Sequence, residues 1–272
     1  MTKLIGLLFT VLAATIVDAN QRITFTDHAV LNIAEMNCLA GDVLNCVRTS
    51  GHHVYEKEIE CPIGGESFKA LFLGTHSTSG LHLDWEPVSY MRFPVPIPVC
   101  PSNGFVVTKE KYSNEELAKW KKAVELKAYK EIYAQKHATF YLYAKLKELG
   151  GEPDDDSWWL YLNATWEADN CKDKDRYRQY ALETIAAAGK RRAKLKDSEE
   201  LYWTLKLITA EMHRRIGDFK TAQELAEAFG TPALEDKDAN EFFLLAKRLL
   251  LNAIKDKNTT RVPIQEIKES EK

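Results

Sequence analysis

The sequence has no excess of positive charge. Its 272 residues include 37 Lys and Arg against 40 Asp and Glu, which gives a net charge of −3 at pH 7. Proteins that bind nucleic acid usually carry a basic surface, so this balance argues against a nucleic-acid partner. Hydrophobic residues make up 45% of the chain, which is enough to build the core of one large domain or two small ones.

The sequence also lacks the short motifs that carry well-known chemistry. It contains no Gly-x-Ser-x-Gly, no His-Glu-x-x-His and no glycine-rich phosphate loop. His82 and Asp84 are two residues apart, so an extended chain would place both on one face. They could form an acid–base pair, and a structural aspartate in a turn is the alternative. We therefore predict no catalytic residue and no cofactor.

Long apolar runs are absent after the first twenty residues. Lys3 precedes an apolar run over residues 4–17, and the small residues Val17 and Ala19 follow as a signal peptidase prefers. This pattern predicts a signal peptide over residues 1–19, cleaved after Ala19, and a periplasmic or secreted protein with no transmembrane segment. A membrane anchor is the alternative, although the run is shorter than the roughly 20 apolar residues of a spanning helix.

Cysteine is scarce, and its number is odd. The five cysteines are Cys38, Cys46, Cys61, Cys100 and Cys171. Thiols can pair outside the cytoplasm. An odd number leaves at least one cysteine outside any intramolecular disulfide, and we expect this to be Cys171.

The rest of the chain divides into parts of different composition. Residues 20–110 are rich in Gly, Pro and β-branched residues, and residues 54–59 and 67–73 read as short strands around a turn. Residues 111–256 follow a helical pattern. The charged residues 257–272 predict a disordered tail.

Apolar residues recur at helical spacing throughout the second part. Ser113 and Glu116 form a predicted capping box at its start. The expected helices cover residues 113–132, 137–149, 157–168, 174–188, 199–215, 219–229 and 238–253.

Four of these helices form two pairs joined by short turns, which indicates a stacked repeat. Residues 214–222 look like a tetratricopeptide turn, in which Gly217 permits a tight bend and Phe219 packs against the preceding helix. A plain antiparallel bundle is the alternative. The predicted fold class is α+β, with a small β-ribbon-like head followed by an all-α, antiparallel, tetratricopeptide-like body.

Two turns in the head share one frame. Residues 61–65 and 100–104 both read Cys-Pro-x-x-Gly, whereas a zinc knuckle reads Cys-Pro-x-Cys-Gly. Gly64 and Asn103 stand where the second cysteine of each knuckle would be. Two thiolates alone cannot complete the four-ligand tetrahedron of a structural zinc site.

These frames, together with residues 83–84, 96–105 and 214–222, resemble an uncharacterised bacterial family known as domain of unknown function 2225. Its members have paired cysteine knuckles followed by tetratricopeptide-like helices. The resemblance covers about residues 60–229 and implies an exported variant with degenerate knuckles. The family has no established activity to transfer to this chain.

The resemblance implies a fate for the two knuckle cysteines. Zinc would hold the knuckle sulfurs close together, so Cys61 and Cys100 are expected to form a disulfide once the metal is lost. The alternatives are a zinc site of Cys61 and Cys100 completed by His52 or His82, or two unpaired thiols. Cys38 and Cys46 form a possible second disulfide.

A helical array without visible chemistry favours a protein-interaction role, as a scaffold or adaptor with a protein partner in the cell envelope. Trp158 and Trp159 are adjacent, so they cannot share one helix face, and one of them could line a binding groove. Arg214 and Arg215 are further candidates for partner binding. A metal-dependent or thiol enzyme or metal binder in the head is one alternative, and a cell-envelope glycan binder is another.

Overall fold

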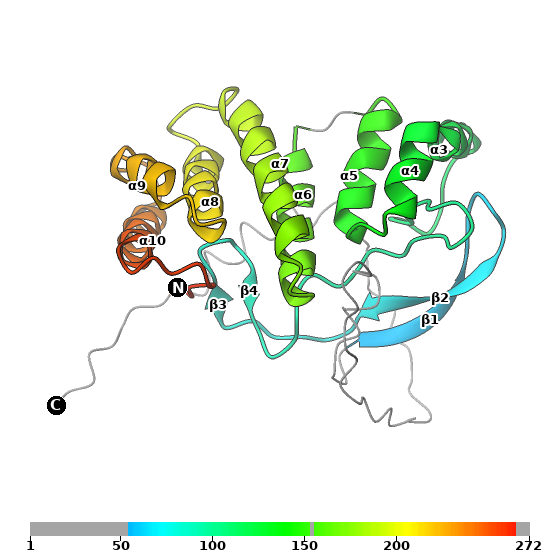
Figure 1. Cartoon of the computed structure of the whole chain (residues 1–272), viewed down its shortest axis with the longest axis horizontal. Coiled ribbons are helices and arrows are strands. Elements are labelled where there is room, and N and C mark those ends of the chain that lie inside the picture. Colours follow the sequence, from blue (N-terminus) through cyan, green and yellow to red (C-terminus); the bar gives the residue numbers. More distant parts are fainter. Residues whose placement is uncertain (1–53, 153–154, 265–272) are drawn as a thin grey trace.

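A computed structural model describes residues 54–152 and 155–264. Over these residues it contains eight helices and two antiparallel strand pairs, so the mixed α and β composition is confirmed. The helices stand side by side in a row, and the strand pairs lie below them near opposite ends of that row (Figure 1). The predicted signal peptide, Cys38, Cys46 and His52 lie outside the described residues.

The predicted strands are present. Strand β1 (Val54–Glu60) pairs antiparallel with β2 (Ser67–Leu73), and the turn between them contains the first Cys-Pro frame. A second pair is very short, with β3 (Gly80–Leu81) beside β4 (Pro87–Val88).

The predicted helices are also present, with small differences in their ends. They are α3 (Asn114–Glu125), α4 (Lys127–Ala134), α5 (Thr139–Leu149), α6 (Ser157–Asn170), α7 (Lys174–Arg192), α8 (Glu200–Arg215), α9 (Phe219–Glu227) and α10 (Lys237–Lys255). Local chemistry explains several starts. The capping box of Ser113 and Glu116 begins α3, and the side chains of Asp173 and Asp218 accept backbone N–H bonds at the starts of α7 and α9.

One expected helix is divided in two. The sequence predicts a continuous helix over residues 113–132, but Leu126 adopts an extended conformation (φ −61°, ψ 134°) between α3 and α4. Leucine is a strong helix former, and neither glycine nor proline is present at the break. The division therefore comes from tertiary packing, and it leaves Leu126 42% exposed.

Helix α5 receives its N-terminal cap from another helix. Its N-cap residue, Ala138, has no side chain that can accept a hydrogen bond. The fully buried carboxylate of Glu167 in α6 accepts the backbone N–H groups of Thr139 and Phe140, each at 3.0 Å. Burial raises the pKa of Glu167 to about 7.

Helix packing follows the chain order. Helix α6 packs against α5 and α7, α7 packs against α8, and α8 packs against α9 and α10. Helix α6 lies within the row, since each of its residues is buried or half-buried. The main hydrophobic core extends from α5 to α10, and a second cluster joins the disulfide to α3, α4 and α5.

The described part of the predicted head packs against the helices. The disulfide shares its apolar cluster with Trp120 and Val124 of α3. Further along the chain, Ile97 donates its backbone N–H to Thr139 of α5, and Phe93 accepts a bond from Asn170 of α6. The segment between β2 and α3 thus lies along the ends of the helices (Figure 1).

The chain after α10 also differs from the prediction. Residues 257–272 were expected to form a disordered tail because of their charge, but residues 257–264 pack against the protein. Leu83 donates its backbone N–H to Val262, and Ile264 donates to Leu81, at 2.9 and 2.7 Å. Ile264 is 8% exposed. The expectation is therefore wrong for residues 257–264.

No helix among the described residues is long and apolar enough to cross a membrane.

Candidate functional site

The two Cys-Pro turns have the same backbone geometry. In the first, Gly65 donates to the carbonyl of Cys61, and in the second Gly104 donates to the carbonyl of Cys100, at 2.8 and 2.9 Å. Both glycines have φ near +75°, where a side chain would be strained. A Cβ on Gly104 would also meet the ring of Tyr133 at 2.7 Å. The Cys-Pro-x-x-Gly sequence therefore forms the same tight turn at both places in the chain.

This shape brings the two predicted cysteines together. The sulfurs of Cys61 and Cys100 are 2.20 Å apart and form a disulfide with a Cα–Cα distance of 5.6 Å. Both residues are almost completely buried. Gly64, in the same turn, donates its N–H to the Cys61 sulfur at 3.2 Å. The expected Cys61–Cys100 pairing is therefore present.

His82, the described one of the two predicted histidine ligands, does not join Cys61 and Cys100 in a group of potential metal ligands. Among the described residues, the potential ligand that approaches the two sulfurs is Glu66, and His82 belongs to a different group with Asp84 and Glu86. Glu66 accepts hydrogen bonds from the backbone and hydroxyl of Ser102 at 3.2 and 2.5 Å. These bonds, together with the disulfide, tie the first turn to the second.

The most strongly charged buried site is an ion cluster of Asp84, Glu86, Asp169, Arg215 and Arg261. Arg215 bridges Asp84 and Asp169, with both N–O distances 2.9 Å. Arg261 contacts Asp84 at 3.4 Å and also pairs with Glu86. The cluster joins four segments that are distant in the sequence: the loop between β3 and β4, the end of α6, the end of α8 and the chain after α10.

The pKa values of two acids in the ion cluster shift in opposite directions. Burial alone would raise the pKa of Asp84, but Arg215 and Arg261 lower it below its usual value. Burial and the charges of Asp84 and Asp169 raise the pKa of Glu86 to about 8, although Arg261 opposes them. Asp84 is therefore ionised at neutral pH, whereas Glu86 is largely protonated.

This arrangement supports a structural role for His82 and Asp84. Asp84 is fully buried and accepts the backbone N–H of Glu86 at 3.3 Å, as a turn aspartate does. His82, Asp84 and Glu86 offer ligand atoms within 4.8 Å of one another. The guanidinium groups of Arg215 and Arg261 already contact the Asp84 carboxylate, however, and their positive charge would repel a divalent cation.

Arg214 and Arg215 are interior residues. Arg214 is completely buried and forms an ion pair with Glu211 at 2.5 Å, and it also donates to the carbonyl of Thr260. Arg215 is 7% exposed and lies over the ring of Tyr177. Their burial contradicts the prediction that they form a partner-binding surface. Arg214 is neutralised by the nearby Glu211, whereas the partners of Arg215 are the distant acids Asp84 and Asp169.

The two adjacent tryptophans differ in burial. Trp158 is 2% exposed, and Trp159 is half-buried against Trp158 and Trp166 at centroid distances of 5.6 and 5.4 Å. The two residues do face different ways, as their adjacency requires. Burial removes Trp158 as a contact for a partner, and the half-buried Trp159 stays a predicted candidate.

A further polar cluster lies between α5 and α7. Nδ1 of His137 is 2.8 Å from the hydroxyl of Tyr180, which also accepts the backbone N–H of Ala138. Burial lowers the pKa of His137 to about 4, so its imidazole is neutral at ordinary pH. With 4% of its surface exposed, His137 stabilises the start of α5 rather than meeting a substrate.

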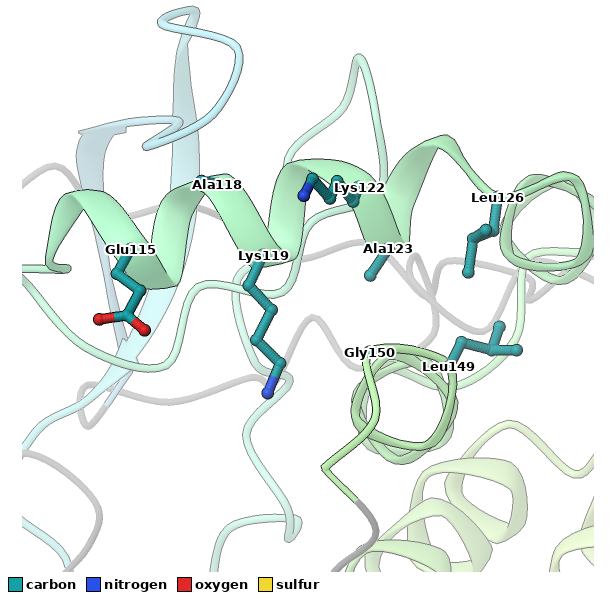
Figure 2. A pocket seen from close by; sticks show the side chains of 8 residues that line it. All are labelled: Glu115, Ala118, Lys119, Lys122, Ala123, Leu126, Leu149 and Gly150. Carbon is teal, nitrogen blue, oxygen red and sulfur yellow. The ribbon is translucent and has the colours of Figure 1, made fainter.

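A hollow that is open to solvent, with a volume of about 460 Å³, lies between α3 and the end of α5. It is lined by Glu115, Ala118, Lys119, Lys122, Ala123, Leu126, Leu149 and Gly150. Leu126 and Leu149 point toward each other at one end of the hollow (Figure 2). Lys119 pairs with Glu152, whereas exposed Lys122 has no ion pair within the described part of the chain. Sequence reasoning missed this site because it depends on the break at Leu126.

Comparisons of the chain with protein-family models, with curated proteins and with solved structures find no match. The proposed resemblance to a knuckle family therefore stays a prediction.

Proposed function

We propose that this chain is an exported, non-enzymatic protein-interaction module, and that the hollow between α3 and α5 receives its protein partner. The observation that carries the proposal is Leu126, an exposed apolar side chain at an unexpected helix break that faces Leu149 across the hollow. Departures from local sequence preference are expected at functional or strained sites.

The chemistry of the hollow indicates what it would accept. Leu126, Leu149 and buried Ala123 offer an apolar surface, and binding energy at interfaces concentrates where an apolar anchor fills such a depression. Lys122 adds an exposed positive charge at the rim. The partner segment we propose therefore carries an apolar side chain with an acidic residue next to it.

The helical body would act as the scaffold for this site. The turn between α8 and α9 supports a tetratricopeptide-like reading, since Gly217 has φ +82° and Ala222 is completely buried. The ion cluster contributes to this scaffold, because Asp84 and Arg215 are buried and join distant segments of the chain.

A matched pair of variants tests the proposal. Leu126→Asp places a charge in the hollow, whereas Leu244→Asp places the same charge at an equally exposed leucine on α10; the two leucines are 42% and 43% exposed. In affinity capture from the cell envelope, proteins recovered with the wild type should be lost with Leu126→Asp and kept with Leu244→Asp. If both variants recovered the same proteins in equal amounts, the hollow would not be the partner site.

A further inference from the structure

The β1–β2 ribbon has an open edge. Its two strands pair only with each other, and among residues 54–152 and 155–264 no backbone group outside the ribbon bonds to β2. Within the described part of the chain, the outer edge of β2 therefore presents a row of N–H and C=O groups without backbone partners. Such a row is a template for an added strand.

The two edges of the ribbon are protected to different degrees. Strand β1 carries four charged residues, Glu56, Lys57, Glu58 and Glu60, and charge is a common way to keep an edge from pairing. Lys69 is the only charged residue of strand β2, which contains neither proline nor glycine. An apolar strand of this kind is prone to associate unless it is covered.

We infer that a second copy of this chain covers the edge, through antiparallel pairing of β2 with β2 about a two-fold axis at Ala70. A four-stranded sheet, β1–β2–β2–β1, would result. In this register Ser67 lies opposite Leu73 of the other copy, Phe68 opposite Phe72, and Lys69 opposite Leu71. A two-fold axis makes each of these contacts occur twice.

The sequence of β2 is complementary to itself in this register. Phe68 and Phe72 meet on one face, and aromatic pairs directly across a sheet are among the stabilising ones. Lys69 meets leucine and not another lysine, so no like charges stand opposite each other. A second copy of β2 already has residues that match this edge, whereas an unrelated peptide would need the same matching residues in the same register.

The conformation of the β1–β2 ribbon is also fixed by contacts with the rest of the protein. The disulfide fixes Cys61 in the turn between β1 and β2, and Glu66, next to the start of β2, is bonded to Ser102. On the face that carries the phenylalanines, Tyr55 stacks on Phe72 with 5.9 Å between centroids. An edge that is already ordered loses less conformational entropy on association than a mobile edge does.

Leu71→Lys tests the inference. Within one copy, Leu71 lies opposite Glu56, so the new lysine gains an acidic neighbour. Between copies it would face Lys69 at both symmetric positions, and like charges directly opposite destabilise a sheet. In sedimentation velocity of the full exported protein, the wild type should be a dimer, and Leu71→Lys should raise the dissociation constant at least about tenfold.

A second variant separates repulsion from misfolding. Lys69→Glu combined with Leu71→Lys restores opposite charges between the copies and should recover the dimer. Lys57→Glu, on β1, should leave it unchanged, because Lys57 lies opposite Ala70 within one copy and outside the proposed contact.

Three results would overturn the inference: a wild-type monomer at all concentrations, a dimer unaffected by Leu71→Lys, or loss of the dimer that the double variant does not restore. Crosslinks from β2 to a different protein would also overturn it, because the edge would then have another occupant. Leu126→Asp should remain dimeric, so failure of the proposed partner site and failure of this inference are distinguishable.

Discussion

The two ends of this molecule use their charged and apolar residues in opposite ways. Around α6 and α8, charges are buried and paired, and they join the loop of Asp84 to the chain after α10. Around α3 and α4, ion pairs such as Lys127–Glu131 are exposed, and an apolar residue, Leu126, faces solvent. Buried ions fix one arrangement of distant segments, whereas exposed apolar surface is available for association. The first end is therefore suited to holding the fold and the second to binding.

The largest expected effect comes from breaking the ion cluster. Asp84→Ala leaves Arg215 without its buried partner, and removal of one member of such a pair costs about 3–5 kcal/mol of unfolding free energy. Urea denaturation measures this change. Lys127→Ala, which breaks an exposed pair at the other end, should leave the midpoint unchanged. Equal effects of the two variants would contradict the contrast between the ends.

A slightly smaller effect is expected from the disulfide. Cys61 and Cys100 are 39 residues apart, and closing a loop of this size stabilises the folded state by about 4 kcal/mol in the chain-entropy account. The double variant Cys61→Ala with Cys100→Ala should lower the urea midpoint accordingly. Hydrogen exchange should show faster opening of β1, β2 and α3, with α6 and α8 still protected. Uniform loss of protection would mean that the two ends unfold as one unit.

The third effect is a dependence of stability on pH. Glu86 binds a proton in the folded state up to about pH 8 but loses it near pH 4.5 when unfolded. Unfolding between these values releases a proton, so stability should fall as the pH rises, by on the order of 3 kcal/mol. Glu167 acts in the same direction up to about pH 7.

Urea denaturation at pH 5 and pH 8.5 measures this dependence. Glu86→Gln cannot ionise, so the difference between the two pH values should become smaller than in the wild type. An unchanged difference would show that Glu86 does not titrate in this range. Asp84 acts in the opposite sense, since its lowered pKa gives stability that is lost at acid pH, below the titration of its unfolded form.

Local signals in the sequence predicted most of the elements. The capping box at Ser113 and the two Cys-Pro frames act within a few residues, so their outcomes can be read without knowledge of the fold. The expected pairing of Cys61 with Cys100 also rested on these frames.

The errors came from interactions between distant residues. Arg261 lies in a charged stretch typical of disorder, yet it reaches Asp84, which is 177 residues away in the chain. Arg214 and Arg215 were named as candidates for partner binding, yet Arg215 is buried against Asp84, which is 131 residues away in the chain. The break at Leu126 has no local cause either, and the hollow depends on it.

The central claim, that partners bind at the α3–α5 hollow, is tested most directly by site-specific photocrosslinking in living cells. A photoreactive phenylalanine analogue would replace Leu126 in one strain and the equally exposed Leu244 in another. The account predicts a discrete crosslinked species, larger than the chain and containing a second protein, from position 126 and none from position 244. The same species from both positions, or none from position 126, would contradict it.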